Sequence, residues 1–437
     1  MKVHPAGRAD VVLVVPLLAA AAAAFGVVGA DARWLAAIGS TIAGGHLVHS
    51  VPFATATTAG WVNAPVLGEL AFHWLWALLG DRGLVLAQVV AVLVAFGALV
   101  RGLRREVADG APVAAVLFFV LVGSLPAVLV ARNQLFSLVL FPLLLLLLER
   151  ETREPSRRIW LAVPLLVLWA NLHGAVLVGY ALLAVYIVVA RRRMFPVVLA
   201  ATLALCATPA LWHTPRYYAS VADNEAAKMG VGLWSPLGTS PSDVLFAIAA
   251  VTLLVIAVWP GTRRWYAWEA VAVVVLAAAS VHAARLGTWL LFVAAYPAAR
   301  SLRLRRPSTA PVLVPAVLVL AVIGGIVHTP FDAGSRELAD FAARSGSPVL
   351  AEPVPAEQVA VAGGMVWVGD PLEAFRHRDQ RIYLDWVAGK AGGSAAVQHA
   401  RLVLVLRDSA AGKTASRDPR LVAVRRTSTA VLYRVRR

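Results

Sequence analysis

Polar side chains that can hold an anion or move a proton interrupt the apolar parts of this sequence. The clearest case is the segment WANLHGAVLVGY, residues 169–180, where Asn171, His173 and Gly174 stand inside a long hydrophobic run. An unpaired amide or imidazole in hydrocarbon costs several kcal/mol. The run must therefore end at these residues or place them in a site. We expect both, namely a turn at a membrane surface whose side chains line a site.

Other groups with comparable chemistry are spread along the chain. Carboxylates can take up a proton, guanidinium groups can hold an anion, and aromatic rings can stack on a ligand. The further candidates are the acids Asp31 and Glu69, the cations Arg132, His282 and Arg285, and the tryptophans Trp34, Trp61 and Trp234. Each type also has a structural interpretation, since arginines snorkel at span ends, tryptophans form belts and a histidine can cap a turn.

The composition is that of an integral membrane protein. Of 437 residues, 60% are hydrophobic and only 15% are charged, whereas soluble domains are about 25% charged. The net charge of +16 would suggest nucleic acid as the partner of a soluble protein. Here most basic residues lie between hydrophobic spans and no nucleic-acid motif is present, so we expect no nucleic-acid partner. The single cysteine excludes a disulfide framework and a cysteine-based metal site.

The positions of the hydrophobic runs predict eleven transmembrane helices. They lie near residues 11–30, 84–100, 112–130, 135–149, 159–171, 174–190, 196–212, 243–259, 267–282, 287–300 and 311–328. A further apolar stretch, 64–79, contains Glu69 and His73, which favour a helix that lies in the interface with its carboxylate on the wet face.

The basic residues orient these spans. With the N-terminus in the cytoplasm, the cytoplasmic segments are 1–10, 101–111, 149–158, 191–195, 260–266 and 300–310. They carry eighteen lysine and arginine residues, against six in the opposite loops up to residue 328. This is the positive-inside pattern, and one additional span would invert every later loop and destroy it.

The composition changes after residue 328. Residues 335–437 alternate a helical pattern, SRELADFAARSG, with the strand patterns SPVLAE, RIYLDW, RLVLVLR and TAVLYRV. We therefore predict an α-helical polytopic membrane protein, with a transmembrane domain over 1–328 and a small α/β domain over 329–437. Its long extracytoplasmic loops are 31–83 and 213–242. The odd span count places the α/β domain outside the plasma (inner) membrane.

On this topology the candidate residues gather on one side. Asp31 follows the first span, Arg132 stands at the second outer turn, and His173 and Arg285 occupy later outer turns. The cytoplasmic turns carry little except arginine and glutamate, as orientation alone requires. The asymmetry indicates a site at the outer surface.

The order of these segments resembles the bacterial membrane glycosyltransferases of the C superfamily. That superfamily is related to protein mannosyltransferases and aminoarabinose transferases, and the chain looks like a divergent branch of it. The matching segments are RNQLFSLVLFPLLLLLLER, WANLHGAVLVGY, LWSP, HAARLGTWLLFVAAYP, a GGMVW strand and an IYLDW strand end. The resemblance covers nearly the whole chain in order, and RNQLFS and NLHG are its most specific parts.

One departure from the family pattern bears on activity. The relatives usually have two aspartates one residue apart, then two tryptophans and a histidine, whereas GADARWLAA keeps only Asp31 and Trp34. A histidine with a carboxylate could hold a divalent cation, but the sequence has no convincing ligand set. A divalent cation therefore stays an open alternative, and we expect no other cofactor.

The resemblance implies transfer of a sugar from a polyprenyl-phosphate donor to a cell-envelope acceptor at the outer face of the membrane. In that reaction Asp31 would take the acceptor proton, and Arg285, Arg132, His173 and His282 would hold the donor phosphate. Trp34, Trp61, Glu69, Asn171 and Trp234 would line the substrate. The partners would be membrane lipid, the donor and an unidentified envelope acceptor.

Two other classes of function compete with this one. A lipid-sugar transporter would need polar residues at mid-membrane depth on discontinuous helices, whereas the polar residues of this chain gather at one face. A non-catalytic lipid-sugar-binding or envelope-assembly protein, derived from a transferase, fits the missing second aspartate. It would keep the cations and lose the base.

Overall fold

The computed structural model describes residues 8–29, 31–58, 60–259, 265–304, 309–327 and 333–436, and these are mostly helical. The chain divides into two compact units. The helical unit consists of Met1–Val28, Arg82–Ala207 and Gly232–Thr329. The mixed unit consists of Gly29–Asp81, Thr208–Val231 and Pro330–Arg437. The predicted domain boundary at 328–329 lies outside the described residues, as do residue 30 and parts of the predicted cytoplasmic segments 1–10, 260–266 and 300–310.

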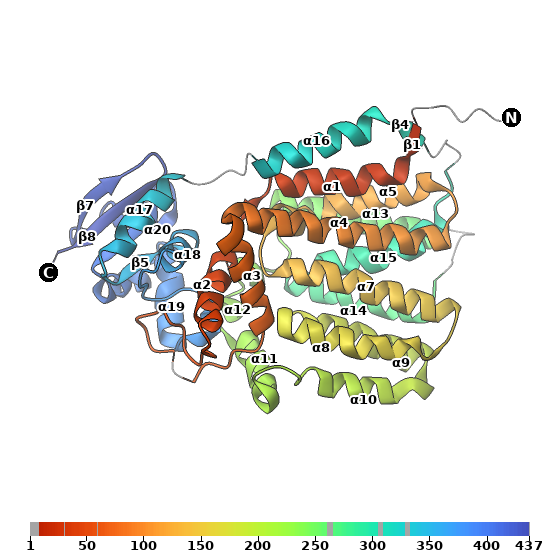
Figure 1. Ribbon diagram of the computed structural model, residues 1–437, viewed down its shortest axis with the longest axis horizontal. Coiled ribbons are helices and arrows are strands. Elements are labelled where there is room, and N and C mark those ends of the chain that lie inside the picture. The colour runs from red at the N-terminus through yellow and green to blue at the C-terminus, as the bar shows by residue number, and fades with distance from the viewer. Residues whose placement is uncertain are drawn as a thin grey trace. The chain divides into compact units, whose positions relative to one another are not determined.

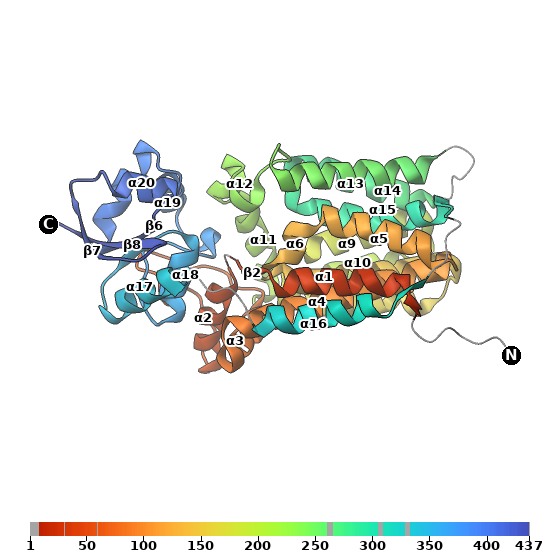
Figure 2. The same cartoon turned by 90° about the horizontal axis from the view of Figure 1, so that it is seen from above.

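The helical unit has a helix in each of the eleven predicted ranges, and neighbouring helices lie side by side (Figures 1 and 2). These helices are α1 (Val14–Ala24), α4 (Asp81–Glu106), α5 (Gly110–Gly123), α6 (Leu125–Leu129), α7 (Gln134–Arg153), α8 (Ala162–Leu172), α9 (Val176–Ala190), α10 (Phe195–Ala204), α13 (Pro241–Val258), α14 (Ala267–His282), α15 (Gly287–Ser301) and α16 (Leu313–Val327). How many of them cross a bilayer stays a prediction.

Short elements connect these helices. Single 3-10 turns occupy Val11–Leu13, Arg157–Leu161, Arg192–Met194, Gly232–Trp234 and Ala284–Leu286. Strand β1 (Arg8–Asp10) pairs antiparallel with β4 (Thr309–Pro311), and β2 (Val27–Val28) pairs parallel with β3 (Val130–Ala131). The predicted span 112–130 is two helices, α5 and α6, because Ser124 ends α5 and Pro126 has no N–H to continue it.

The helical unit exposes large apolar side chains, which supports immersion in hydrocarbon. Helix α13 alone exposes Val244, Leu245, Ile248, Val251, Val255 and Val258, and exposed apolar patches of this extent are rare on soluble monomers. By length and composition, α4 and α13 could each cross a membrane. Among the described residues, the shorter apolar helices of this unit are Val11–Ala24, Gly110–Gly123, Val176–Ala190, Ala267–His282 and Leu313–Val327, and Val66–Leu79 of the mixed unit is another.

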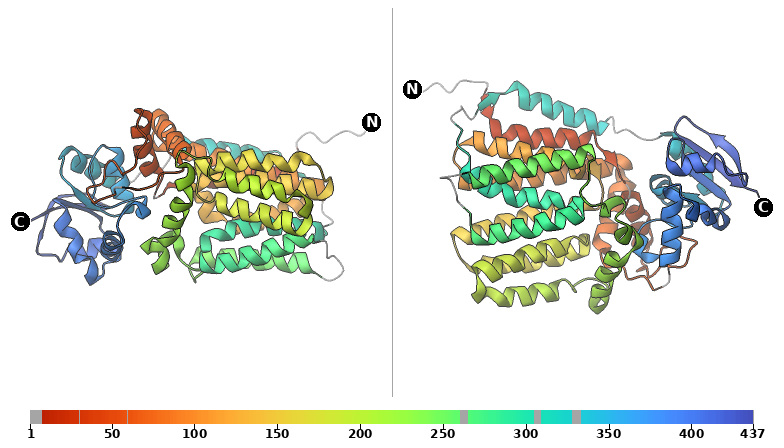
Figure 3. Two further views of the ribbon diagram at one scale, coloured as in Figure 1. Left: turned by 90° about the horizontal axis from the view of Figure 1, so that it is seen from below. Right: turned by 180° about the vertical axis from the view of Figure 1, so that it is seen from behind.

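The mixed unit contains a four-stranded sheet with helices packed on it, drawn in blue in Figure 3. Its strands are β5 (Val349–Ala351), β6 (Leu402–Leu406), β7 (Leu421–Arg426) and β8 (Ala430–Val435), in the order β5-β6-β8-β7. Only the β5–β6 pair is parallel. The helices are α2 (Ala32–Ala43), α3 (Val66–Leu79), α11 (Thr214–Asp223), α12 (Glu225–Met229), α17 (Ala333–Arg344), α18 (Pro353–Val361), α19 (His377–Val387) and α20 (Ala410–Ala415). Three 3-10 segments in the described part of this unit complete it, at Leu211–His213, Leu372–Ala374 and Ala391–His399.

Most of the two predicted outer loops, residues 31–81 and 213–231, belongs to this unit and is largely helical. Residues 53–56 run beside Val366 and Trp367, where Thr55 N–H donates to the Val366 carbonyl at 2.8 Å. Glu225 joins the unit through an N–H bond to Gln380 at 2.8 Å and an ion pair with Arg381 at 2.7 Å. The segments predicted to lie outside therefore fold together with the C-terminal region.

The strand predicted at RIYLDW is wrong, because these residues lie in α19. The buried side chains of α19 are Gln380, Tyr383 and Trp386, and a spacing of three fits one face of a helix rather than alternation in a strand. GGMVW contributes only isolated bridges at Val366. The other three predicted strands contain β5, β6 and β8, and β7 was not predicted.

Candidate functional site

Arg132 stands where an extended segment turns into a helix. The β2–β3 pairing holds Val130 and Ala131 extended, and α7 begins two residues later at Gln134. The guanidinium of Arg132 donates to the side-chain carbonyl of Gln134. Arg132 is thus held at the N-terminal end of α7, where the helix dipole adds to its positive charge.

The polar break at residues 171–173 is a turn between α8 and α9. The Asn171 amide donates to the backbone carbonyls of Val167, at 2.8 Å, and Ala207, at 2.7 Å. His173 ends α8 in extended conformation, with its N–H bonded to the Trp169 carbonyl at 2.9 Å. Asn171 therefore braces the turn, and its predicted contact with substrate stays a prediction.

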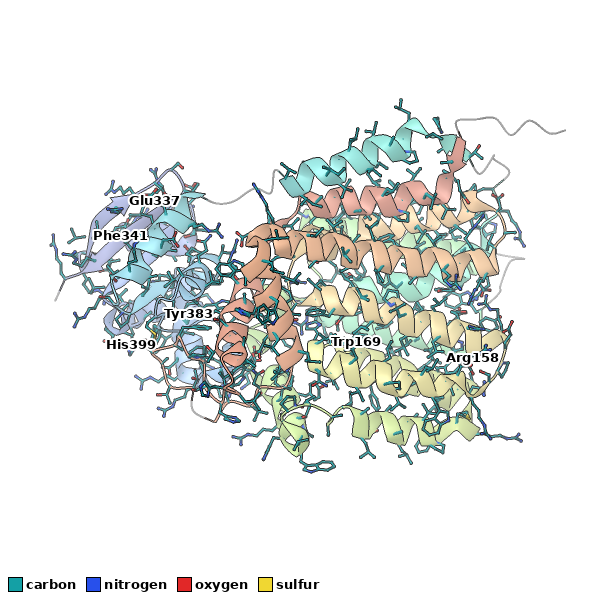
Figure 4. The ribbon with its side chains drawn as sticks, viewed as in Figure 1. Arg158, Trp169, Glu337, Phe341, Tyr383 and His399 are labelled. Atoms are coloured by element: carbon teal, nitrogen blue, oxygen red, sulfur yellow. The ribbon has the colours of Figure 1, made fainter. Side chains whose placement is uncertain are left out.

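His173 is hydrogen-bonded to Ser137, which is in turn hydrogen-bonded to Trp169 in the interior of the helical unit. Nδ1 of His173 lies 2.6 Å from the Ser137 hydroxyl of α7. The indole N–H of Trp169 donates to the same hydroxyl at 2.8 Å. Figure 4 labels Trp169 on α8, toward the opposite end of that helical segment from Arg158. Neither Ser137 nor Trp169 was predicted from the sequence, because each looks like an ordinary residue of an apolar span.

Arg285 lies in the turn between α14 and α15. Its guanidinium carbon lies 3.8 Å from the ring centroid of Trp234. Two backbone bonds fix the segment that carries the ring, from Leu237 N–H to the Val281 carbonyl and from Ala284 N–H to the Ser235 carbonyl, both at 3.1 Å. The predicted tryptophan and arginine thus form a cation–π pair.

Electrostatics link the two arginines to the histidine. Burial, the charge of Arg285 and the charge of Arg132 together lower the pKa of His173 to about 3. Three of the four predicted phosphate ligands, from three separate turns, are therefore close enough for the charges of both arginines to act on the histidine. His282 is not among them: it is exposed, and its side chain forms no hydrogen bond or ion pair with the described residues. A neutral imidazole within the field of two guanidinium groups is a combination of groups that can bind an anion.

Asp31, the predicted base, belongs to the mixed unit. It precedes α2 with a left-handed backbone, at a φ of 99°. Its side chain makes no capping bond to α2. Such a conformation costs a non-glycine residue about 1–3 kcal/mol and persists only where the surroundings impose it.

A buried ionic network holds the start of α2. Arg33 pairs with Glu357 at 2.9 Å and with Asp81 at 2.9 Å, and its N–H donates to Glu357 at 3.1 Å. Arg336 also pairs with Asp81, at 2.7 Å. This network explains how the chain can hold Asp31 in a strained conformation. It joins residues far apart in the sequence, and no local pattern predicts it.

Two further carboxylates lie near this position. Burial raises the pKa of Glu357 well above its usual range; Arg33 opposes the shift, and the charges of Asp31 and Asp370 increase it. Burial also raises the pKa of Asp370 to about 6. Asp370 follows Gly369, whose backbone packs against the Trp34 ring. Among the described residues, no group of three or more His, Cys, Asp or Glu side chains could hold a metal ion.

The other predicted lining residues are packed inside the mixed unit. Trp34 is 1% exposed and stacks on Phe53 at 4.8 Å, and Trp61 is buried in the same core. Glu69 is also 1% exposed and accepts a 2.6 Å bond from the Asn63 amide, so the expectation that it faces water is wrong. Contact of these residues with a substrate stays a prediction.

Comparison with known proteins gives a distant structural likeness. No protein-family model matches the chain, and no curated protein matches it. The chain is similar to the crystal structure of ArnT from Cupriavidus metallidurans in the apo state, with 15% identity, 95% of this chain and 96% of that chain covered, and a TM-score of 0.42. It is similar also to the structure of ArnT from the same organism bound to undecaprenyl phosphate, with 14% identity, coverages of 97% and 96%, and a TM-score of 0.42.

Proposed function

We propose that this protein is an integral membrane glycosyltransferase that moves a sugar from a polyprenyl-phosphate donor to a cell-envelope acceptor. The observation that carries the proposal is the cluster of Arg132, His173 and Arg285 in a unit that exposes apolar helices. An anion site in such a unit suits the phosphate of a lipid. The sequence resemblance to C-superfamily glycosyltransferases supports the same reaction.

In the proposed reaction the acceptor hydroxyl attacks the anomeric carbon of the sugar. Asp31 takes the hydroxyl proton as the new C–O bond forms. The bond between the anomeric carbon and the phosphate oxygen breaks, and the polyprenyl phosphate leaves with the electron pair. Arg132 and Arg285 stabilise the charge that develops on the leaving phosphate. We further propose that the reaction takes place on the outer face of the plasma membrane, with the N-terminus in the cytoplasm.

A non-catalytic lipid-sugar-binding protein is the second candidate. It is favoured by the single aspartate of GADARWLAA, where the resembling family usually has two. Such a protein would use the arginine and histidine cluster to bind the donor and would transfer nothing.

Turnover by the purified protein separates the two functions. The protein in nanodiscs is supplied with polyprenyl-phosphate sugars and a cell-envelope acceptor pool, and released polyprenyl phosphate is measured. We expect release by the wild type and a loss of about 10²–10⁴-fold in Asp31→Asn, the range for a missing general base, with donor binding unchanged. Donor binding without release by the wild type would instead establish the non-catalytic function.

A further inference from the structure

Ser137 is a buried serine whose hydrogen bonds can be assigned in direction. Its side chain is fully buried in α7, with one bond to Trp169 and one to His173. An indole N–H can only donate, so Ser137 accepts from Trp169. The serine hydroxyl still has one proton to donate, and within the described residues its single acceptor is Nδ1 of His173.

The opposite direction would leave a buried donor unpaired. If Nδ1 carried a proton and donated to Ser137, the serine oxygen would accept twice and its own proton would have no acceptor among the described residues. An unsatisfied buried donor costs about 1–3 kcal/mol. The favoured arrangement is therefore a chain of donors from Trp169 to Ser137 to Nδ1, and the imidazole proton lies on Nε2.

The surrounding packing keeps this chain in place. Gly179 of α9 lies against the Trp169 ring, at a distance that leaves no room for a Cβ atom. Phe141 meets the same ring edge-on at 6.5 Å and 89°. Trp169 itself is fully buried. The indole donor is thus fixed in direction by packing and not only by its hydrogen bond.

We propose that Ser137, oriented by Trp169, is a positioning residue that fixes His173 as the Nε2–H tautomer, so that His173 donates a neutral hydrogen bond to the phosphate bound by Arg132 and Arg285. This inference rests on the proposed function for its ligand. In this arrangement the two arginines attract the phosphate by their charge, and the Nε2–H of the histidine orients it through a hydrogen bond. Before the phosphate binds, the charged groups that act on His173, Arg285 and Arg132, both oppose its protonation, so the free site presents a neutral donor.

The tautomer can be measured directly. Protein labelled with ¹⁵N-histidine is reconstituted in nanodiscs, and the His173 signals are assigned from their absence in His173→Gln. We expect a protonated Nε2 and an unprotonated Nδ1 in the wild type without ligand, and a shift of the Nε2 signal on addition of undecaprenyl phosphate. In Ser137→Ala we expect part of the population to carry the proton on Nδ1.

Binding measurements test whether this tautomer matters. Ser137→Ala is expected to weaken undecaprenyl phosphate binding about three- to tenfold, the value of one directed hydrogen bond. In the His173→Gln background, which keeps a side-chain N–H donor and no tautomer, Ser137→Ala should have no further effect. The matched control is Ser280→Ala, which removes a buried hydroxyl whose one hydrogen bond within the described part of the chain goes to the Leu276 carbonyl, at 2.6 Å, and should bind as the wild type does.

The outcomes distinguish this inference from the proposed function. A wild-type His173 protonated on Nδ1, or on both nitrogens, would overturn the inference even if the lipid binds. Equal effects of Ser137→Ala in both backgrounds would also overturn it, because they would indicate loss of packing alone. Failure of the wild type to bind undecaprenyl phosphate would overturn the proposed donor, and with it the ligand assigned to Nε2.

Discussion

Asp31 has a backbone conformation that only glycine adopts without cost. Because the chain has an aspartate at this costly position, we infer that the protein needs the carboxylate. The φ of Asp31 is 99°. Replacement by glycine should relieve about 1–3 kcal/mol of strain, so we expect Asp31→Gly to unfold at a higher temperature. The same variant should lose transfer about 10²–10⁴-fold, because the base is gone.

Asp31→Ala is the matched comparison, since it removes the base but keeps the unfavourable φ. It should be as inactive as Asp31→Gly and less stable, as seen by thermal unfolding in detergent. Full transfer by either variant would exclude Asp31 as the base. A lower unfolding temperature for Asp31→Gly than for Asp31→Ala would contradict the role of backbone strain.

Glu69 makes the stability of the mixed unit depend on pH. Burial raises the pKa of Glu69 to about 8 despite the bond from Asn63, and Glu373 adds to the shift. The folded protein therefore binds this proton more tightly than the unfolded chain does. The stabilisation is fully present below the unfolded pKa of about 4.5 and is lost as pH rises through about 8, with a size on the order of 5 kcal/mol.

Glu69→Gln keeps the shape of a neutral carboxyl and cannot ionise. We expect this variant to lose less stability than the wild type between pH 5 and pH 9, measured as the unfolding temperature at a series of pH values. Parallel curves for the two proteins would show that Glu69 is ionised in the folded state.

At the scale of elements, Arg300 connects four helices of the helical unit. Its guanidinium lies 3.5 Å from Glu106 of α4 and 3.6 Å from Glu149 of α7, and it pairs with Glu269 of α14. Arg300 is itself on α15 and is 6% exposed. We attributed the arginine and glutamate residues near the predicted cytoplasmic turns to membrane orientation alone. Some of them also form this buried cluster.

Removing Arg300 would leave three buried carboxylates without their common partner. We expect Arg300→Ala to lose about 3–5 kcal/mol, the cost of breaking a buried ion pair, measured by thermal unfolding in detergent. Arg303→Ala removes an exposed arginine three residues away and should unfold as the wild type does. Partial recovery is expected when Glu149→Gln is added to Arg300→Ala. Equal stability of Arg300→Ala and the wild type would contradict this role.

The elements that could be predicted are those defined by local pattern. Apolar runs located the long helices, and short stretches rich in valine and leucine located β5, β6 and β8. The pattern failed at RIYLDW, where buried Tyr383 and Trp386 follow helical spacing. Clustering on predicted outer turns pointed to Arg132, His173 and Arg285. Glu357 could not be found this way, because its partner Arg33 is 324 residues away.

At the scale of the whole molecule, the topology is a prediction that accessibility can test. The cytoplasmic side is represented by Glu154 and the C-terminal region by Ser416, both exposed. In a Cys206→Ala background, Ser416→Cys should react with an impermeant thiol reagent in intact cells, and Glu154→Cys should react only after the cells are opened. Labelling of Glu154→Cys in intact cells would contradict the span count. Ser335 is unsuitable for this test because it is buried against Gln358.

The binding of undecaprenyl phosphate tests the central claim most directly, since both the proposed reaction and the role of Ser137 depend on it. Equilibrium binding to the purified protein in nanodiscs is compared for the wild type, Arg132→Ala, Arg285→Ala and Arg303→Ala. We predict binding by the wild type and by Arg303→Ala, and at least a tenfold loss in each of the other two, since hydrogen bonds to charged groups are worth about 1.5–3 kcal/mol. Equal affinity in all four proteins, or no binding by any of them, would contradict the account.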